Sequence, residues 1–326
     1  MAVSATDILV VSIDSTTGWR AAARELRESL ERAGARVVGV GTGPVPNVRT
    51  FALTDLTQAR AARRACLAGI AEHGPRAVIY CSITATLLWP TPGAVWLDTI
   101  AAENRPGRHG VWQRPVERRR LAQAPLVMAM SPQSLQPLGD GIEHVVLPVA
   151  VDRSGPPPPR RDIAAITYAG DPQKKRLDHV LAAWAEARKG EETLVVAGID
   201  DAPRPDGVRV AGRLPQDEYR ELLRRARVFV AAPRREDHGI APLEALADGC
   251  MLVTTRAPGP YPALALAEQL DPRLVGDDLA GQLRIALDDP RPDYADHAAE
   301  LLAPFSRQAV DRTVGERVLP RLLAAR

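Results

Sequence analysis

The sequence predicts an α/β protein built from two Rossmann-like, doubly wound domains. Two observations predict this class: short β-branched apolar runs alternate with helical patterns along the whole chain, and a proline run at 156–159 divides the alternation into two halves. Short apolar runs suit parallel strands covered on both faces, and 326 residues exceed the size of most single domains. We therefore expect an N-terminal domain over residues 1–155 and a C-terminal domain over residues 156–326.

The composition excludes several classes of protein. The formal net charge of +2 gives no reason to expect nucleic acid as a partner. Only three cysteines are present, widely spaced, which argues against a disulfide framework or zinc site and favours a reducing, cytoplasmic compartment. The N-terminus lacks the pattern of a signal peptide, and no run approaches the ~20 apolar residues of a membrane span. Because no Asp-x-Asp motif occurs, we expect no bound metal.

The N-terminal half opens with a βαβ pattern. A strand over 7–13, a turn over 14–18, a helix over 19–33 and a strand over 36–40 follow one another. Gly18 closes a polar turn at a strand's carboxyl end, where open α/β sheets bind ligands; the alternative is an ordinary βα turn. The glycines between 39 and 43 do not indicate a dinucleotide site, since they follow the second strand and precede prolines.

The rest of this half contains further strands and a basic helix. We expect a helix over 56–73 and strands over 77–81, 94–97, 126–130 and 144–148, with Asp98 directly after the strand over 94–97 and Asn104 and Arg105 as further polar candidates on a loop. The helix over 112–123 carries four arginines, Arg114, Arg118, Arg119 and Arg120. It could dock on anionic lipid, or form a solvated face with Glu117 as a paired acid, which is the interpretation that we favour.

In the C-terminal half, the first βα loop is strongly basic. Between a strand over 163–169 and a helix over 177–188, Lys174, Lys175 and Arg176 follow one another. Three cations at a strand's carboxyl end suit a diphosphate, because ammonium and guanidinium groups both bind phosphate oxygens. The alternative is a solvated charge run. Further elements follow: strands over 193–198 and 208–214, a helix over 216–226, a strand over 274–276, and helices over 278–287, 294–302 and 313–324.

The segment 228–255 organises this half. It predicts a strand, a polar loop, a helix over 240–248 with Pro242 at its first position, and a second strand, with Gly249 ending the helix. Glu236 then lies in the loop and Glu244 in the first helical turn. The backbone N–H groups at the helix start offer an anion site. Carboxylates beside it can accept from sugar hydroxyls, which indicates a nucleotide-sugar; alternatively, both acids only complement the helix dipole.

Residues 236–249 resemble the signature of the retaining, GT-B-fold glycosyltransferases called group 1, which has two glutamates separated by seven residues. His238 stands where an aromatic residue is usual. With Leu177 and Asp178 aligned, Lys175 falls on the family's lysine, and the strand that ends near Arg213 resembles the one that packs against the nucleobase. Two departures occur: Leu97 replaces the histidine of a His-Asp pair, and Asp171 replaces an arginine.

The resemblance implies two domains facing each other across a cleft, which closes on the donor, with a last helix that can cross back to the first domain. It implies a retaining, metal-independent transfer of a sugar from a nucleotide-diphosphate sugar, with no cofactor. The acceptor would be a small molecule, glycan or lipid-linked compound bound by the first domain. The implied catalytic residues are Glu236, Lys175 and Asp98, and the implied donor-binding residues are Gly18, Lys174, Arg213, His238, Gly239, Ile240, Ala241 and Glu244.

Two other functions stay open at this point. One is a nucleotide-sugar epimerase of the same fold, which would act without an acceptor. The other is a non-catalytic nucleotide-binding subunit of a biosynthetic complex, an alternative that the departures at Leu97 and Asp171 keep open.

Overall fold

The protein folds into two compact units, seen in a computed structural model that describes residues 6–14, 17–46, 48–136, 138–139 and 141–324. The first unit comprises residues 1–150 and 307–326, and the second comprises residues 151–306. The division therefore falls five residues before the boundary expected at 155, and the proline run at 156–159 belongs to the second unit. Residues 307–326, which include the helix that was expected to cross back to the first domain, are part of the first unit.

The sheet of the first unit has six parallel strands in the order β2-β1-β3-β4-β5-β6. The chain order reverses between β1 and β3, so the loops after these two strands diverge at a topological switch point. The strands are short and mostly buried, as the apolar runs predict. Their bounds are β1 Ile8–Ser12, β2 Val37–Gly41, β3 Ala77–Cys81, β4 Ala94–Leu97, β5 Val127–Ala129 and β6 His144–Val146.

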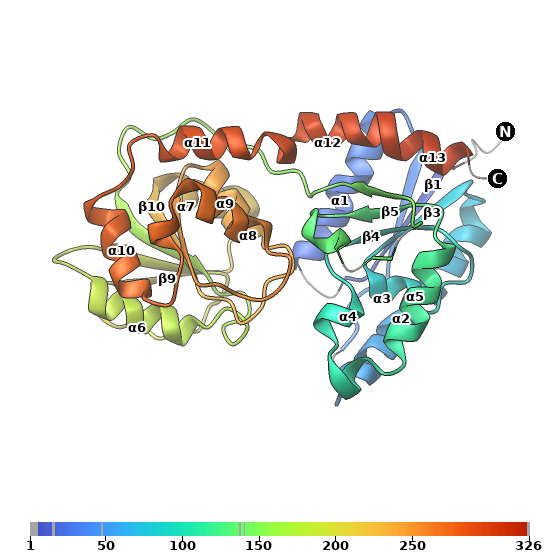
Figure 1. Ribbon diagram of the computed structural model, residues 1–326, viewed down its shortest axis with the longest axis horizontal. Coiled ribbons are helices and arrows are strands. Elements are labelled where there is room, and N and C mark those ends of the chain that lie inside the picture. The colour runs from blue at the N-terminus through green and yellow to red at the C-terminus, as the bar shows by residue number, and fades with distance from the viewer. Residues whose placement is uncertain (1–5, 15–16, 47, 137, 140, 325–326) are drawn as a thin grey trace. The chain divides into compact units, whose positions relative to one another are not determined.

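Helices cover both faces of this sheet (Figure 1). One layer contains α2, α3 and α5, which pack on one another, and α1 lies against β1 and β2. The short elements between β3 and β6 were not all expected, because one-turn helices carry little periodicity. The helices are α1 Thr17–Arg32, α2 Phe51–His73, α3 Ile83–Thr86, α4 Ala101–Asn104 and α5 Gln113–Gln123, with 3₁₀ turns at Gly107–Gly110 and Gln133–Leu135.

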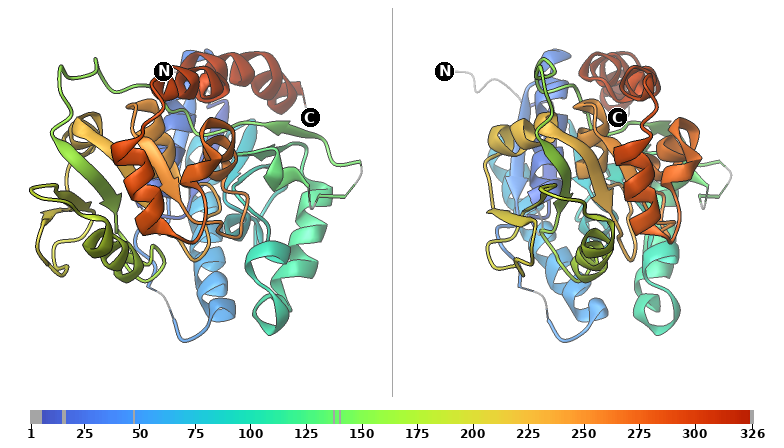
Figure 2. Two further views of the ribbon diagram at one scale, coloured as in Figure 1. Left: turned by 60° about the vertical axis from the view of Figure 1, so that its left-hand side comes forward. Right: turned by 90° about the vertical axis from the view of Figure 1, so that its left-hand side faces the viewer.

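The C-terminal segment packs on α1 (Figure 2). It consists of α12 Arg307–Thr313, a π-helical turn Val314–Val318 and α13 Leu319–Ala324, where the sequence predicted one helix over 313–324. Asp311 anchors it: its carboxylate accepts from the Ser29 hydroxyl at 2.6 Å and from Arg32 Nε at 2.7 Å. Ser29 is fully buried, so this contact satisfies a polar group that would otherwise lack a partner.

The second unit has a five-stranded parallel sheet in the order β11-β10-β7-β8-β9. Here the chain order reverses between β7 and β10, which are neighbours in the sheet although their paired positions Ile163 and Ala226 are 63 residues apart in the chain. The loops that leave these two strands begin side by side. The bounds are β7 Ile163–Tyr168, β8 Leu194–Ala197, β9 Val208–Gly212, β10 Ala226–Ala231 and β11 Met251–Thr254.

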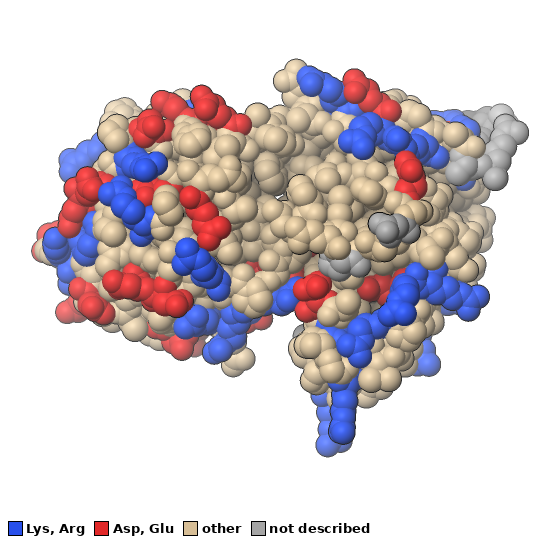
Figure 3. Space-filling view, in the orientation of Figure 1, with Lys and Arg blue, Asp and Glu red and all other residues tan. Residues whose placement is uncertain are grey.

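Two helical layers enclose the second sheet. On one face α6 and α10 pack together, and on the other α7, α8 and α11 are in contact. Charged side chains of both signs are interspersed over the visible surface of this unit (Figure 3). The helices are α6 Leu177–Ala187, α7 Gln216–Arg225, α8 Ile240–Ala247, α9 Pro262–Leu270, α10 Leu279–Asp288 and α11 Tyr294–Leu301, with 3₁₀ turns at Pro272–Leu274 and Ala303–Phe305. None of the helices in the described part of the chain is long and apolar enough to span a membrane.

The strand expected over 274–276 is wrong. That stretch follows a 3₁₀ turn, and only Val275 makes a single bridge, to Thr254. A run of three residues is too short to specify a ladder without its neighbours. Helix α9, which the sequence analysis did not include, begins at Pro262, a residue that suits the first helical position because its missing N–H is not needed there.

Two expectations for the first unit also need correction. Glu117 is not on a solvated helix face: it is 3% exposed, and its Oε2 accepts from the backbone N–H of Ala101 at 2.7 Å. Burial raises the pKa of Glu117 to about 7, although the Ala101 N–H and Arg105 act in the opposite direction. Asn104, expected in a loop, is the last residue of α4, and Arg105 directly after it is bound to Asp55 through two hydrogen bonds of 2.9 and 3.0 Å.

We predict that Asp311→Ala lowers the free energy of unfolding by about 1–2 kcal/mol, because the buried Ser29 hydroxyl loses its acceptor and Arg32 keeps only its contacts with Glu25 and Glu28. Urea unfolding followed by circular dichroism measures it. Glu316→Ala is the matched control, since Glu316 is an exposed acid on the same segment and should change stability by less than ~0.5 kcal/mol. Equal effects of the two substitutions would contradict the anchoring role of Asp311.

Candidate functional site

The basic loop after β7 and the acidic loop after β10 meet at the switch point of the second sheet. The Lys175 ammonium bonds to Oε2 of Glu236, and Lys174 Nζ lies 3.8 Å from Oε1 of the same carboxylate. The two loops are also joined through the backbone, because the N–H of Arg234 donates to the carbonyl of Lys174 at 2.9 Å. Residues 61 positions apart are thus brought into contact by strand order alone.

Glu236 is held rigidly by its own backbone. Its side chain is 7% exposed, and its N–H donates to the carbonyl of Pro258 at 3.0 Å, while its carbonyl accepts from Tyr261 at 3.3 Å. Gly259 makes this close approach feasible: a Cβ there would lie 2.2 Å from the Glu236 carbonyl oxygen. A buried carboxylate needs a paired charge, which Lys175 supplies.

The start of helix α8 lies directly beside this pair. Gly239 caps the helix in the left-handed conformation (φ 74°), and a Cβ at this position would lie 2.9 Å from Cγ of Glu236. The backbone N–H groups of Ile240 and Ala241 have no hydrogen-bond partner within the described chain, as expected for a helix start. Pro242 is the third helical residue rather than the first, which still leaves its missing N–H within the unbonded first turn.

His238 is buried behind the same loop. It is 6% exposed, and neither ring nitrogen has a hydrogen-bond partner among the residues that the structure describes. Burial lowers the pKa of His238 to about 4, and the nearby Glu236 only partly offsets it. The ring is therefore neutral at pH 7.

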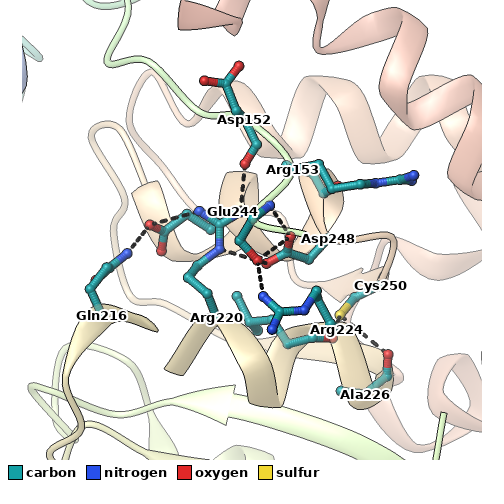
Figure 4. A network of polar contacts seen from close by, with 12 residues as sticks. Asp152, Arg153, Gln216, Arg220, Arg224, Ala226, Glu244, Asp248 and Cys250 are labelled. Carbon is teal, nitrogen blue, oxygen red and sulfur yellow. Dashed lines mark hydrogen bonds and ion pairs between the residues drawn. The ribbon is translucent and has the colours of Figure 1, made fainter. Parts of the chain in front are cut away.

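Glu244 belongs to a different part of the site. It is the fifth residue of α8, so it lies beyond the first turn expected from the sequence. Its Oε1 accepts from Nε2 of Gln216 and lies 3.7 Å from the guanidinium of Arg220 (Figure 4). Burial raises the pKa of Glu244 to about 7, although Arg220 and Gln216 oppose the shift and Asp248 adds to it.

Arg220 does not neutralise Glu244 fully because it is shared. Its Nε donates to Asp248 at 2.6 Å and its Nη2 donates to the carbonyl of Asp152 at 2.7 Å (Figure 4). Asp248 also accepts from the N–H and hydroxyl of Ser154, at 2.8 and 2.9 Å. The Arg220 guanidinium therefore holds α7, α8 and the first segment of the unit together, and Glu244 is its most distant acid.

A small hollow lies beside Glu236. Lys175, Glu236 and Ala241 line it together with Tyr168 and Pro242. The Tyr168 ring lies 5.5 Å from the ring of Tyr219, and burial raises the pKa of both phenols, with Glu244 adding to the shift. The site thus combines one paired carboxylate, one carboxylate of raised pKa, a helix start and an aromatic wall.

The remaining candidate residues lie elsewhere. Arg213 follows β9, is exposed, and lies 3.6 Å from Asp200. Gly18 is an exposed residue in the first turn of α1, whereas Thr16 of the same expected loop lies outside the described residues. Asp98 follows β4, and its carbonyl accepts from the Ser134 hydroxyl. Gly18 and Asp98 belong to the first unit, so the structure of the second unit does not test their roles.

Sequence reasoning missed the residues that surround Glu244. Gln216, Tyr219 and Arg220 come from α7, and no local motif marks them. The one available signal was the spacing of Glu244 and Asp248, which places two acids on one helix face and predicts a basic partner.

Comparison with known proteins shows that part of the chain matches the model of a known family. Residues 162–302, within the second unit, match the family model described as Glycosyl transferases group 1. No curated protein sequence matches the chain.

Three solved structures are similar over nearly the whole chain. Sucrose-phosphate synthase from Thermosynechococcus elongatus has TM-score 0.69 and 17% identity, covering 98% of this chain and 100% of that chain. WaaG, a glycosyltransferase involved in lipopolysaccharide biosynthesis, has TM-score 0.70 and 14% identity, covering 95% and 99%. An α,α-trehalose-phosphate synthase (UDP-forming) from Burkholderia xenovorans has TM-score 0.66 and 11% identity, covering 97% and 100%. At these identities the likeness shows a shared fold.

The enzyme class predicted from the sequence, a glycosyltransferase, is confirmed by the family match together with this fold. The α/β class with parallel sheets is confirmed as well.

We predict that Glu244→Gln stabilises the free protein above neutral pH. A folded-state pKa of about 7, above the ordinary 4.5, means that the wild type loses stability as the pH rises from 4.5 through 7. The variant should gain roughly 1–3 kcal/mol in free energy of unfolding at pH 8 and nothing at pH 4. Urea unfolding at both pH values measures this, with the exposed Glu221→Gln on α7 as control. A gain that is independent of pH would contradict the assignment.

Proposed function

We propose that this chain transfers a sugar from a nucleotide-diphosphate sugar to an acceptor hydroxyl, with retention at the anomeric carbon and without a metal ion. The observation that carries the proposal is the contact between Lys175 and Glu236 beside the start of α8, at the sheet's switch point. The cation and the helix start attract the negatively charged diphosphate of such a donor, and the buried carboxylate accepts hydrogen bonds from its sugar hydroxyls.

Lys175 and the start of α8 would bind the diphosphate. The ammonium group and the N–H groups of Ile240 and Ala241 are preorganised donors on one side of the small hollow. Negative charge grows on the departing diphosphate as the glycosidic bond breaks, so these donors bind the transition state more tightly than the ground state. Lys174, half-exposed and near the same carboxylate, can supply a second cation.

Glu236 would orient the transferred sugar. An ionised carboxylate only accepts hydrogen bonds, and two sugar hydroxyls can donate to its two oxygens. In the free protein Lys175 neutralises this carboxylate. When phosphate oxygens bind Lys175, the Glu236 carboxylate loses part of its contact with that cation, and sugar hydroxyls that donate to it replace this contact. The diphosphate and the sugar of the donor are thus recognised together.

Glu244 would bind the ribose diol. Its raised pKa reflects a carboxyl group poised between its protonated and ionised forms, and two hydroxyl donors would favour the ionised form. Nearby, the aromatic wall of Tyr168 and Arg213 beyond β9 suit the nucleobase and the ribose.

The first unit would bind the acceptor. Asp98, at the carboxyl end of β4, would lie near the reacting sugar, and Gly18, in the first turn of α1, would approach the donor diphosphate. Because Leu97 stands where the similar enzymes carry a histidine, Asp98 would act by a polar contact to the reacting sugar, and the departing diphosphate would take up the acceptor's proton.

A ligand screen with substitutions at the switch point tests this function. Thermal-shift titration with UDP, GDP, ADP and TDP and with their sugars identifies the donor. We predict that Lys175→Ala lowers kcat by roughly 10²–10³ with that donor and weakens diphosphate binding, because it removes a preorganised cation. Each variant is compared with its own ligand-free melting temperature, since Lys175→Ala also leaves the buried Glu236 with only the more distant Lys174.

Lys189→Ala is the matched control. Lys189 lies exposed just beyond α6 and pairs with the exposed Asp288, so its loss should leave binding and turnover unchanged. Glu236→Ala should abolish turnover while nucleoside diphosphate, which lacks the sugar, still binds. Product analysis with and without acceptor separates transfer from epimerisation. Unchanged diphosphate binding in Lys175→Ala would overturn the phosphate assignment.

A further inference from the structure

A second hollow, of about 530 Å³, lies at the carboxyl edge of the second sheet. The start of α6, the segment after β10 and the segment after β11 form its walls. Pro233 is the one residue that it shares with the smaller hollow around Glu236 and Lys175. None of the residues assigned above to the donor lines it, so it is a separate site of the same unit.

Three guanidinium groups from three segments line this hollow. Arg176 precedes α6, Arg234 follows β10 and Arg256 follows β11. Arg176 has no ion-pair or hydrogen-bond partner for its side chain within the described chain, whereas Arg234 donates to a backbone carbonyl at 3.1 Å. Arg256 lies 3.3 Å from the exposed Glu268, a weak pair. Convergent cations repel one another, and a bound anion would offset that repulsion.

The wall also contains a polar group without a partner. Thr255 is 3% exposed, and its hydroxyl has no hydrogen bond to any described residue. Leaving such a hydroxyl unpaired is unfavourable, so most buried polar groups have a partner. The adjacent α6 begins without a side-chain cap, at Arg176 in the left-handed conformation (φ 50°). The N–H groups of Leu177 and His179 in the first turn already donate to the carbonyls of Pro172 and Arg176, so the Thr255 hydroxyl is the group that a ligand would satisfy.

We propose that this second hollow binds a small phosphate monoester. Guanidinium groups pair with phosphate oxygens in a fork geometry, and the α6 dipole favours the same charge. Its volume falls within the range of small-molecule sites and exceeds that of a bare phosphate. Asp178, Asp277 and His179 on the rim can bind hydroxyls of the organic part. The site is assigned from this lining and does not depend on the proposed donor.

The hollow is physically connected to Glu236. Pro258 lines it, and the Pro258 carbonyl accepts the Glu236 N–H at 3.0 Å. Ligand binding that moves this segment would therefore alter the affinity for anything that contacts Glu236, and the coupling would be reciprocal.

Isothermal titration calorimetry on the full chain tests the site, with glucose 6-phosphate and inorganic phosphate as probes and glucose as the uncharged control. Both phosphate probes should bind and glucose should not. Arg176→Gln should raise the Kd about tenfold, because it removes one charged phosphate contact. Thr255→Val should also weaken binding without lowering the melting temperature of the free protein, since it removes a hydroxyl that has no partner.

Lys175→Ala, which alters the smaller hollow only, separates the two sites. Retained phosphate-monoester affinity in Lys175→Ala supports the second site, whatever becomes of donor binding. In a mixture with donor sugar, an altered donor affinity without consumption of glucose 6-phosphate marks it as an effector and supports the site. Unchanged affinity in Arg176→Gln, equal losses in Lys175→Ala, or no heat of binding at millimolar probe would overturn it.

Discussion

The contact between Glu236 and Lys175 is the interaction on which the rest of the site depends. It exists because β7 and β10 are neighbours in the sheet and their loops leave from the same edge. The cation supplies the counter-charge that a buried carboxylate needs, and the carboxylate holds the cation in place. The backbone contacts with Pro258 and Tyr261 then fix the pair beside the start of α8.

A second group of charges gives the site a different property. Arg220 joins α7 and α8 through Asp248, and it lies too far from Glu244 to neutralise that acid completely. The protein therefore keeps a buried carboxyl group of raised pKa, which costs stability above neutral pH. Such a cost is expected where a ligand, rather than the protein, completes the hydrogen bonding. The unpaired hydroxyl of Thr255 in the second hollow is a second buried polar group whose hydrogen bonding a ligand would complete.

The segment after β11 connects the larger hollow of the second unit with Glu236 in the smaller one. The residues after β11 pass from Thr255 in the larger hollow to Pro258 and Gly259, which pack against the backbone of Glu236. Gly259 permits that approach, since any Cβ there would collide with the Glu236 carbonyl. A single loop thus connects an arginine-lined hollow with the carboxylate of the proposed donor site, and this connection gives a physical route for coupling between two ligands.

The sequence by itself determined the α/β class, the order of most strands and the loops that carry Lys175 and Glu236, because period-two and period-3.6 patterns and turn residues act locally. It could not determine that Glu117 and Arg105 face inward, that 274–276 forms no strand, or that Gln216 and Arg220 surround Glu244. Those outcomes depend on which elements pack together, and packing joins residues far apart in the chain. Only the tertiary structure decided which charges are paired, because pairing and burial are properties of neighbours in space rather than in sequence.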